Sequence, residues 1–412
     1  MVLAEKLGKF SDARDAVDNL LKSPGLTAVE QQFALSRKAW LAEMVLDFDT
    51  ALATTQKLTN DGLAKDQKAL KLAMYAELAS KDAKPFYAEF LKTSKDDDRN
   101  VAITAQFVRE SKEPLKEIEK NKATLMKRPN ELGALYLDAY AKTGSIEIAK
   151  KAIAVPAIAA TPSGKALARQ VILDEFAKTQ KKIVSHQLDS SNQKKLASTL
   201  KARVALLDET EKLANRAIAA GDWTAELVTL DLLAKQSERF YQEVLALPVP
   251  QGLSPAEESE YLTLLSQQAA PHQLRANDVA KKVNEFWDNK EAMAALDKAS
   301  ETETGSRRLV VMKEIEALQA AAPEAKKTQL TAMLAKKEAA KEAAPTLASI
   351  EGARQAVREN PMNRTSLENL LALERKTGRN QTMVSYLEGR IETLGTAETS
   401  SNMTSPVQKG TK

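Results

Sequence analysis

The chain has 412 residues, of which 43% are hydrophobic and 28% are charged, a composition typical of folded globular proteins rather than of disordered segments. Its 60 basic and 56 acidic residues give a formal net charge of +4, which disfavours a dedicated nucleic-acid-binding protein with its usual basic excess. Cysteine is absent, which excludes disulfides, thiolate nucleophiles and cysteine-ligated zinc. No stretch reaches the ~18 consecutive apolar residues of a membrane-spanning helix, so we expect no direct membrane insertion by this chain.

Helix-breaking residues are scarce along the whole chain. Glycine and proline number 14 each, while Ala, Leu, Lys and Glu, which lose little entropy in a helix, are abundant. The composition therefore predicts an all-α fold. The chain begins at Met1–Lys6 with what looks like the middle of a helix and has no apolar signal-peptide core, so we expect it to be part of a longer protein.

The N-terminal third carries the signature of short helical hairpins. Residues 7–13 predict a turn followed by a second helix, and residues 35–58 predict the next unit, with its turn at 46–51. Residues 129–155 predict a proline-led helix, a turn at Gly144 and a second helix. Asn130, next to Pro129, is the expected N-cap of this unit.

The middle of the chain predicts longer helices. From about residue 164 to residue 247, apolar residues recur three and four positions apart with few breakers. Gly221 and Asp222 predict a helix stop followed by an N-cap. Two prolines at 248 and 250 then predict an extended link, after which Ser254 is expected to cap a helix that starts at Pro255.

The C-terminal part returns to the hairpin pattern. Residues 317–348 are rich in Ala, Lys and Glu and predict helices interrupted at Pro323 and Pro345. Residues 361–394 repeat the arrangement of residues 129–155, with Asn363 as the expected cap and Gly378 at the turn.

Three segments share an Ala-basic-x-Ala-aliphatic pattern, at 13–17, 149–153 and 353–357. Small residues three apart lie on one helical face, where a neighbouring helix can approach closely. Together with the turns, these units resemble tetratricopeptide repeats, over roughly residues 1–155 and 345–394. The resemblance implies an elongated α-solenoid, a right-handed superhelix of helical hairpins that binds a peptide or helix on its concave face. Asn369 matches one position of that family's carboxylate clamp, but the N-terminal units offer no matching pair, so the clamp is incomplete.

A second resemblance covers about residues 240–290. This passage is similar to tetratricopeptide-containing cell-envelope proteins of delta-class proteobacteria, including some tied to gliding motility. The resemblance implies a periplasmic or cell-envelope location rather than a cytoplasmic one. The absence of cysteine is compatible with either compartment.

Residues with catalytic chemistry do not form a motif. His186 and His272 lie far apart, and neither belongs to a metal-binding spacing. Ser163-Gly164-Lys165 is similar to the end of a phosphate-binding loop, but Ala159 stands where that loop needs glycine. We therefore interpret Ser163 as a helix cap and expect no catalytic residue, cofactor or metal ligand.

Aromatic residues are only 5% of the chain, and several cluster in one region. They serve either as core anchors or as a partner-binding surface, since Tyr and Trp dominate binding hot spots. The candidate partner-binding residues are Trp223, Phe240, Tyr241, Tyr261, Phe286 and Trp287.

The sequence thus predicts hairpins at 1–160, a long-helix segment at 161–310, further hairpins at 311–395 and a disordered tail at 396–412. The expected function is a non-catalytic scaffold that binds a protein or peptide partner and no nucleic acid. The alternative is a structural or assembly subunit of a cell-envelope machine, for motility or transport. A helical lyase or transferase is a third hypothesis. The sequence does not define the oligomeric state.

Overall fold

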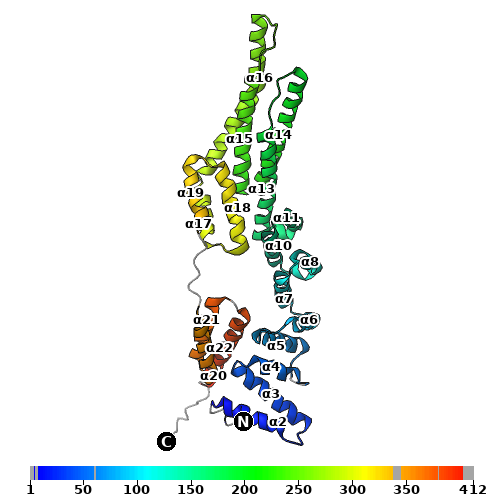
Figure 1. Cartoon of the computed structure of the whole chain (residues 1–412), viewed down its shortest axis with the longest axis vertical. Helices are drawn as coiled ribbons and strands as arrows, with labels where there is room; N and C mark the ends of the chain where they lie inside the picture. Colours follow the sequence, from blue (N-terminus) through cyan, green and yellow to red (C-terminus); the bar gives the residue numbers. More distant parts are fainter. Residues whose placement is uncertain (1–3, 5–7, 60–61, 337–344, 379, 402–412) are drawn as a thin grey trace, which may run out of the picture. The chain divides into compact units, whose positions relative to one another are not determined.

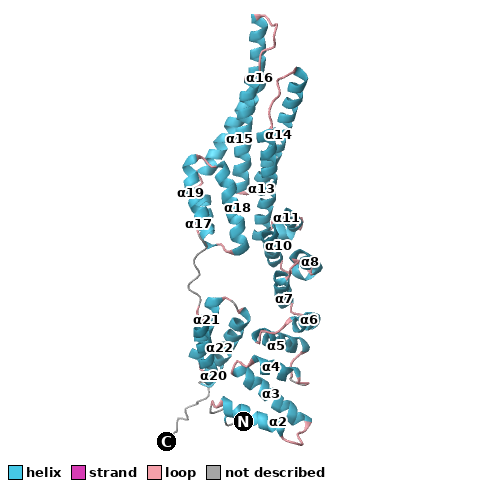
Figure 2. Cartoon of the chain, viewed as in Figure 1, coloured by secondary structure: helices cyan, strands magenta, loops and turns pink. Residues whose placement is uncertain are grey.

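The computed structural model describes residues 4, 8–59, 62–336, 345–378 and 380–401 (Figure 1). Within these ranges every regular element is a helix and no strand is present (Figure 2). The predicted all-α fold is confirmed.

The helices group into two compact units. One unit combines Met1–Asn100 with Lys341–Lys412, and the other is Val101–Ala340. We call them the discontinuous unit and the continuous unit. The predicted division near residues 160 and 310 is a different partition of the chain and stays a prediction.

The N-terminal part of the discontinuous unit is a series of helices in which each packs on the next, from α2 to α6. A small apolar core forms where Phe10, Ala13 and Val17 of α2 meet Leu41 of α3. The helices are α2 (Phe10–Lys22), α3 (Ala28–Met44), α4 (Phe48–Gln56), α5 (Lys65–Leu78), α6 (Lys84–Thr93) and α7 (Asp97–Glu110), which contains the boundary between the units.

The C-terminal helices complete the same unit. They are α20 (Leu347–Glu359), α21 (Arg364–Thr377) and α22 (Gln381–Ser401), and α22 packs against α5, far away in sequence (Figure 1). The predicted disordered tail, 396–412, begins inside α22, whose helix continues to Ser401. The rest of that tail, 402–412, lies outside the described residues.

The continuous unit starts with short helices and continues with long ones. Helices α13, α14, α15 and α16 have 24, 28, 23 and 33 residues, which confirms the prediction of longer helices in the middle. Helix α15 packs between α14 and α16, and α18 returns to pack on α10, α13 and α15. The bounds are α8 (Pro114–Lys120), α9 (Lys122–Leu125), α10 (Pro129–Thr143), α11 (Ile146–Ile153), α12 (Pro156–Ala159), α13 (Pro162–Ser185), α14 (Gln193–Ala220), α15 (Trp223–Leu245), α16 (Pro255–Trp287), α17 (Lys290–Thr302), α18 (Gly305–Ala321) and α19 (Glu324–Ala335).

Most predicted helix ends are confirmed. Gly221 ends α14 in the left-handed conformation, with φ 60°, and Asp222 caps α15 by accepting a hydrogen bond from the Ala225 amide. Gly378 ends α21 in the same way, with φ 59°. Ser254 caps α16 in a capping box with Glu257. These signals are local, so the flanking residues alone determine them.

Two predicted caps are wrong. Ser163 lies buried inside the first turn of α13, and Thr161 is the cap, accepting from the Gly164 amide at 3.0 Å. Asn130 is the second residue of α10, and Arg128 holds the N-cap position without a side-chain hydrogen bond. In both cases a proline takes the first helical position, so the cap is the residue directly before it.

Helices α12 and α13 approach each other closely at Gly164. A Cβ atom at this position would lie 1.9 Å from the Ile158 carbonyl oxygen, a backbone atom that cannot move aside alone. We expect Gly164→Ala to destabilise the continuous unit by roughly 1–3 kcal/mol or more, which urea unfolding followed by circular dichroism would measure. Gly352→Ala in α20 is the control, because nothing lies within 4 Å of the position that its added methyl group would take, and we expect a gain of about 0.4–1 kcal/mol. Equal effects of the two substitutions would contradict the close approach.

Candidate functional site

Five of the six aromatic residues predicted to bind a partner lie in or against one core, that of the continuous unit. Phe240 and Trp287 are each 4% exposed and belong to this core. Trp223, Tyr241 and Phe286 are half-buried and pack against it. Tyr261 is separate, half-buried, with its hydroxyl donating to the Pro248 carbonyl at 3.4 Å. The structure thus assigns the first five a packing role, and partner binding by these residues stays a prediction.

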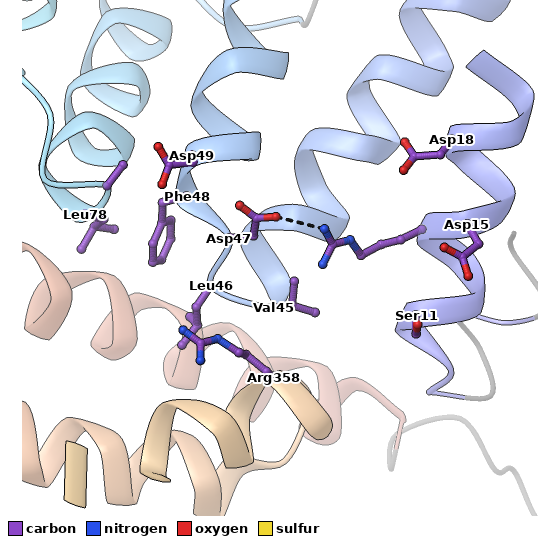
Figure 3. Close-up of a pocket in the computed structure, with 12 residues that line it drawn as sticks. Ser11, Asp15, Asp18, Val45, Leu46, Asp47, Phe48, Asp49, Leu78 and Arg358 are labelled. Atoms are coloured by element: carbon purple, nitrogen blue, oxygen red, sulfur yellow. Dashed lines mark hydrogen bonds and ion pairs between the residues drawn. The ribbon is translucent and has the colours of Figure 1, made fainter. Parts of the chain in front are cut away.

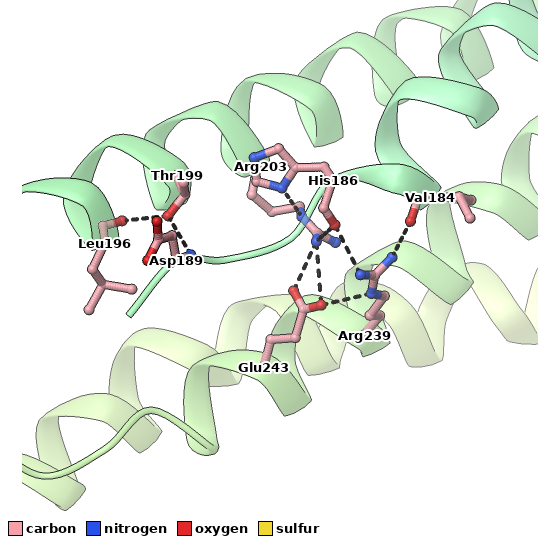
Figure 4. A network of polar contacts seen from close by, with 8 residues as sticks. All are labelled: Val184, His186, Asp189, Leu196, Thr199, Arg203, Arg239 and Glu243. Atoms are coloured by element: carbon pink, nitrogen blue, oxygen red, sulfur yellow. Dashed lines mark hydrogen bonds and ion pairs between the residues drawn. The ribbon is translucent and has the colours of Figure 1, made fainter. Parts of the chain in front are cut away.

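A polar network in the continuous unit holds the connection between α13 and α14 against α15 (Figure 4). The guanidinium of Arg203, fully buried, donates to the His186 carbonyl at 2.7 Å and to His186 Nδ1 at 3.1 Å. It also pairs with Glu243 at 3.1 Å. Arg239 donates to the carbonyls of Val184 and His186 and pairs with the same carboxylate. Arg203 and Arg239 bind carbonyl groups at the end of α13 and the Glu243 carboxylate of α15. The network therefore holds these helices together.

A second network joins α13, α15 and α18. The Arg169 guanidinium lies between Asp222, at 2.7 Å, and Glu314. Thr224 donates to Glu314 at 2.5 Å. The pKa of the Glu314 carboxyl is raised, because the effect of burial outweighs the opposing effects of Arg169 and of the Thr224 hydrogen bond. This network places a paired carboxylate in the interior and fixes α18 on the other two helices.

An acidic pocket of about 600 Å³ lies in the discontinuous unit, lined by α2, the α3–α4 turn and the ends of α5 and α20 (Figure 3). Three of its aspartates already have cationic partners. Asp47 pairs with Arg14 at 2.9 Å, Asp18 pairs with Lys38 at 2.6 Å, and Asp49 pairs with Lys81. No group of three or more His, Asp or Glu residues in the described parts of the chain is arranged to hold a metal ion.

The feature with the geometry of a binding site is an apolar groove in the discontinuous unit, which we call the α3–α22 groove. Its volume is about 730 Å³, within the range of ligand pockets. It is open to solvent between α3 and α5 on one side and α22 on the other. Its lining consists of Trp40, Glu43, Met44, Gln67, Leu70, Lys71, Met74, Arg99, Met362, Ser385, Tyr386, Gly389, Arg390, Thr393 and Leu394.

Polar contacts on backbone atoms fasten α22 to the end of α3. Arg390 is only 8% exposed and donates to the Met44 carbonyl at 3.0 Å and to the Pro361 carbonyl at 2.5 Å. Tyr386 donates to the Glu43 carbonyl at 3.1 Å, and its ring meets Phe48 edge-on at 5.4 Å. Burial raises the pKa of Tyr386 to about 12, so its hydroxyl stays protonated and able to donate at neutral pH.

The other side of the groove is equally well supported. Trp40 packs on Phe10, with ring centroids 6.1 Å apart, and the Arg37 guanidinium lies 4.6 Å from the Trp40 ring centroid. Glu43 accepts from the buried Tyr75 hydroxyl and pairs with Lys71 at 3.2 Å. Phe10 and Tyr75, which support Trp40 and Glu43, do not line the groove, and the apolar side chains of the lining are left half-buried or exposed.

Sequence reasoning missed this groove because its walls are distant in the chain: Tyr386 and Glu43 are 343 residues apart. One local signal points to it. Arg390 continues the buried stripe of Met383 and Leu387 on α22, at a position where an apolar residue is expected. An arginine in such a stripe indicates a specific set of acceptors opposite it.

Comparison with protein families, curated proteins and solved structures gives no match to this chain. Among the helices that the structure describes, none combines the length and the apolar character needed to cross a membrane.

Loss of the Arg390 guanidinium should release α22 from α3. Arg390→Met keeps a long side chain but leaves the carbonyls of Met44 and Pro361 without their donor. We expect a cost of about 2–4 kcal/mol, visible as a lower urea midpoint and as faster amide exchange in α22. The control is Arg375→Met, since Arg375 is exposed and pairs with Glu388 at 2.7 Å on the surface. An effect of Arg390→Met no larger than that of the control would contradict the anchoring role.

The His186 contacts predict a loss of stability in acid. Burial, and then the neighbouring Arg203, lower the pKa of His186 in the folded chain. As pH falls below about 6.5, the unfolded chain binds a proton before the folded chain does, so this contribution to stability decreases. We expect the urea midpoint of the wild type to fall more between about pH 7.5 and about pH 5.5 than that of His186→Gln. His272, whose pKa is also lowered, is present in both proteins and cancels from the comparison. Parallel pH profiles would contradict this prediction.

Proposed function

We propose that this protein is a non-catalytic interaction scaffold of the tetratricopeptide-like type, and that its α3–α22 groove binds a segment of a partner protein. The observation that carries the proposal is an open cavity of about 730 Å³ whose wall is largely apolar. Half-buried apolar side chains in a concave site gain free energy when a partner removes them from water. Those side chains are Trp40, Met44, Leu70, Met74 and Leu394, together with the 48%-exposed Met362.

The arrangement of the helices supports a solenoid. From α2 to α6 each helix packs on the next one in the chain, and α10 with α11 and α21 with α22 form further pairs of successive helices. Nearest-neighbour packing of this kind is characteristic of repeat proteins, which present extended surfaces to partners. Gly144 and Gly378 end the first helix of the latter two pairs, as the repeat-like pattern requires.

The polar clusters support a structural rather than a catalytic role. Arg203, Arg169 and Arg390 donate to helix ends or to carboxylates within their own unit. An active site needs a nucleophile or base that is poised toward an open space, with its partners arranged to activate it. The groove instead offers apolar contact area with charged groups at its margin.

A structural or assembly role in a cell-envelope machine is the alternative proposal, supported by the sequence resemblance over residues 240–290. The two proposals are compatible, since an assembly subunit also needs a surface for its neighbours. The groove favours the more general one, because it identifies where a partner would lie.

Filling the groove should abolish partner binding without unfolding the chain. Gly389 lies on α22 inside the groove, and nothing lies within 4 Å of the position its Cβ would take. Gly389→Phe therefore places a ring in open space, and Phe is a better helix former than Gly. Gly352→Phe is the matched control, because Gly352 is also helical and has open surroundings, yet lines no part of this groove.

The measurement is capture of partners from extracts of the source organism with three immobilised baits: the wild type and the two variants. We expect a saturable partner that binds the wild type and Gly352→Phe and is lost with Gly389→Phe. The proposal fails if no partner saturates the wild type, or if Gly389→Phe retains every partner that the wild type binds.

A further inference from the structure

The charges along the α3–α22 groove are unbalanced. Lys71, Arg99 and Arg390 line it, whereas Glu43 is the one acidic residue among its described lining residues. Glu43 is also fully engaged, since it accepts from Tyr75 and pairs with Lys71 at 3.2 Å. The groove therefore carries an excess of positive charge next to its apolar wall.

Arg390 is the most unusual of these cations, because it is buried without a counter-ion in the described part of the chain. Its partners there are three neutral oxygen atoms: the carbonyls of Met44 and Pro361, and the Tyr386 hydroxyl at 3.0 Å. The buried Arg390 Nε also lacks a hydrogen-bond acceptor among the described residues. A buried charge that no opposite charge balances is costly, and the negative end of the α3 dipole, at Met44, offsets only part of that cost.

A nearby anion would offset more of it. Coulomb interactions at a site of low solvent exposure are stronger than in bulk water, so a carboxylate in the groove would be attracted by Arg390 even without touching it. Lys71 and Arg99 lie at the groove surface, with 38% and 62% of their side chains exposed, where a ligand can contact them directly. Glu43, the partner of Lys71, is shared with the Tyr75 hydroxyl. Asp96, the partner of Arg99, is exposed to solvent.

The apolar lining limits what kind of anion fits. Met44, Met74 and Met362 are three unbranched, polarisable side chains that can adapt to several large apolar groups. A small inorganic anion would leave this lining exposed to water. A peptide segment that carries both carboxylates and large apolar side chains complements both the cations and the apolar lining of the groove.

We infer that the α3–α22 groove selects acidic peptide segments, in which Asp or Glu side chains lie next to large apolar residues, with Lys71 and Arg99 contacting the carboxylates. This inference rests on the proposed function and specifies the chemistry of the partner. Charge complementarity at a groove margin mainly contributes specificity and association rate, while the apolar contacts contribute most of the affinity.

The test uses the full chain and a display library of short random peptides as the probe. Peptides are selected on the wild type and screened again on Gly389→Phe, so that only groove-dependent sequences remain. We expect these to be enriched both in Leu, Ile, Met, Phe or Trp and in Asp or Glu, relative to the unselected library.

One selected peptide is then titrated by fluorescence anisotropy. We expect its Kd to rise roughly tenfold with the double substitution Lys71→Gln and Arg99→Gln. The matched control, Lys92→Gln with Arg375→Gln, neutralises two exposed cations of the same unit outside the groove and should leave the Kd within about twofold. A peptide with its acidic residues changed to amides should lose a similar factor against the wild type and little more against the Lys71/Arg99 variant.

The outcomes separate the two proposals. Groove-dependent peptides without acidic enrichment, or a Kd that the Lys71/Arg99 variant leaves unchanged, would overturn the inference and leave the proposed function standing. A library that yields no peptide sensitive to Gly389→Phe would overturn both. Unfolding curves of every variant confirm that a lost interaction does not reflect a lost fold.

Discussion

Carbonyl groups at the end of helix α3 determine where helix α22 attaches in the discontinuous unit. The last carbonyls of a helix have no amide partner within the helix, and a buried one needs a donor from elsewhere. Arg390 of α22 supplies such a donor to the Met44 carbonyl, and Tyr386 adds a second donor to the Glu43 carbonyl, which already accepts from the Leu46 amide at 3.1 Å. Because Arg390 also binds the Pro361 carbonyl, one side chain fixes α22 to both α3 and the turn between α20 and α21. This junction sets where α22 lies against α3, and the Thr382 hydroxyl, which donates to Glu77, adds a contact with α5.

The continuous unit uses the same chemistry at other helix ends. Arg203 and Arg239 both donate to the His186 carbonyl, directly after α13. Arg308 donates to the carbonyls of Ser300 and Lys336, at the ends of α17 and α19. Guanidinium groups suit this task, because they present several donors in a plane and keep their charge when buried. Their positive charge also opposes the negative end of each helix dipole.

The ends of helices could be predicted from the sequence, whereas the packing of one helix on another that is distant in the chain could not. Gly221 with Asp222, and Ser254 with Pro255, determine a stop or a cap through contacts over a few residues, so their pattern suffices. Thr161 was equally predictable as the cap, because Pro162 marks the first helical position. The pairing of α22 with α3 and α5 depends on contacts across more than 300 residues. No repeat period or charge pattern in the sequence indicates which distant helices pack together, and the groove was not predicted for this reason.

Because α22 is one wall of the groove, the proposed binding of a partner would be thermodynamically linked to the packing of α22 on α3 and α5. A ligand that contacts α3, α5 and α22 together binds only the closed arrangement, so it stabilises that arrangement as its concentration exceeds its Kd. The linkage is reciprocal: a change that loosens α22 lowers the fraction of chains competent to bind and raises the apparent Kd by the same factor. Arg390 would then affect binding twice, through its charge and through the position of α22. Lys71 and Arg99 make none of the described hydrogen bonds that hold α22 to α3, which is why they, rather than Arg390, would report on the acidity of a ligand.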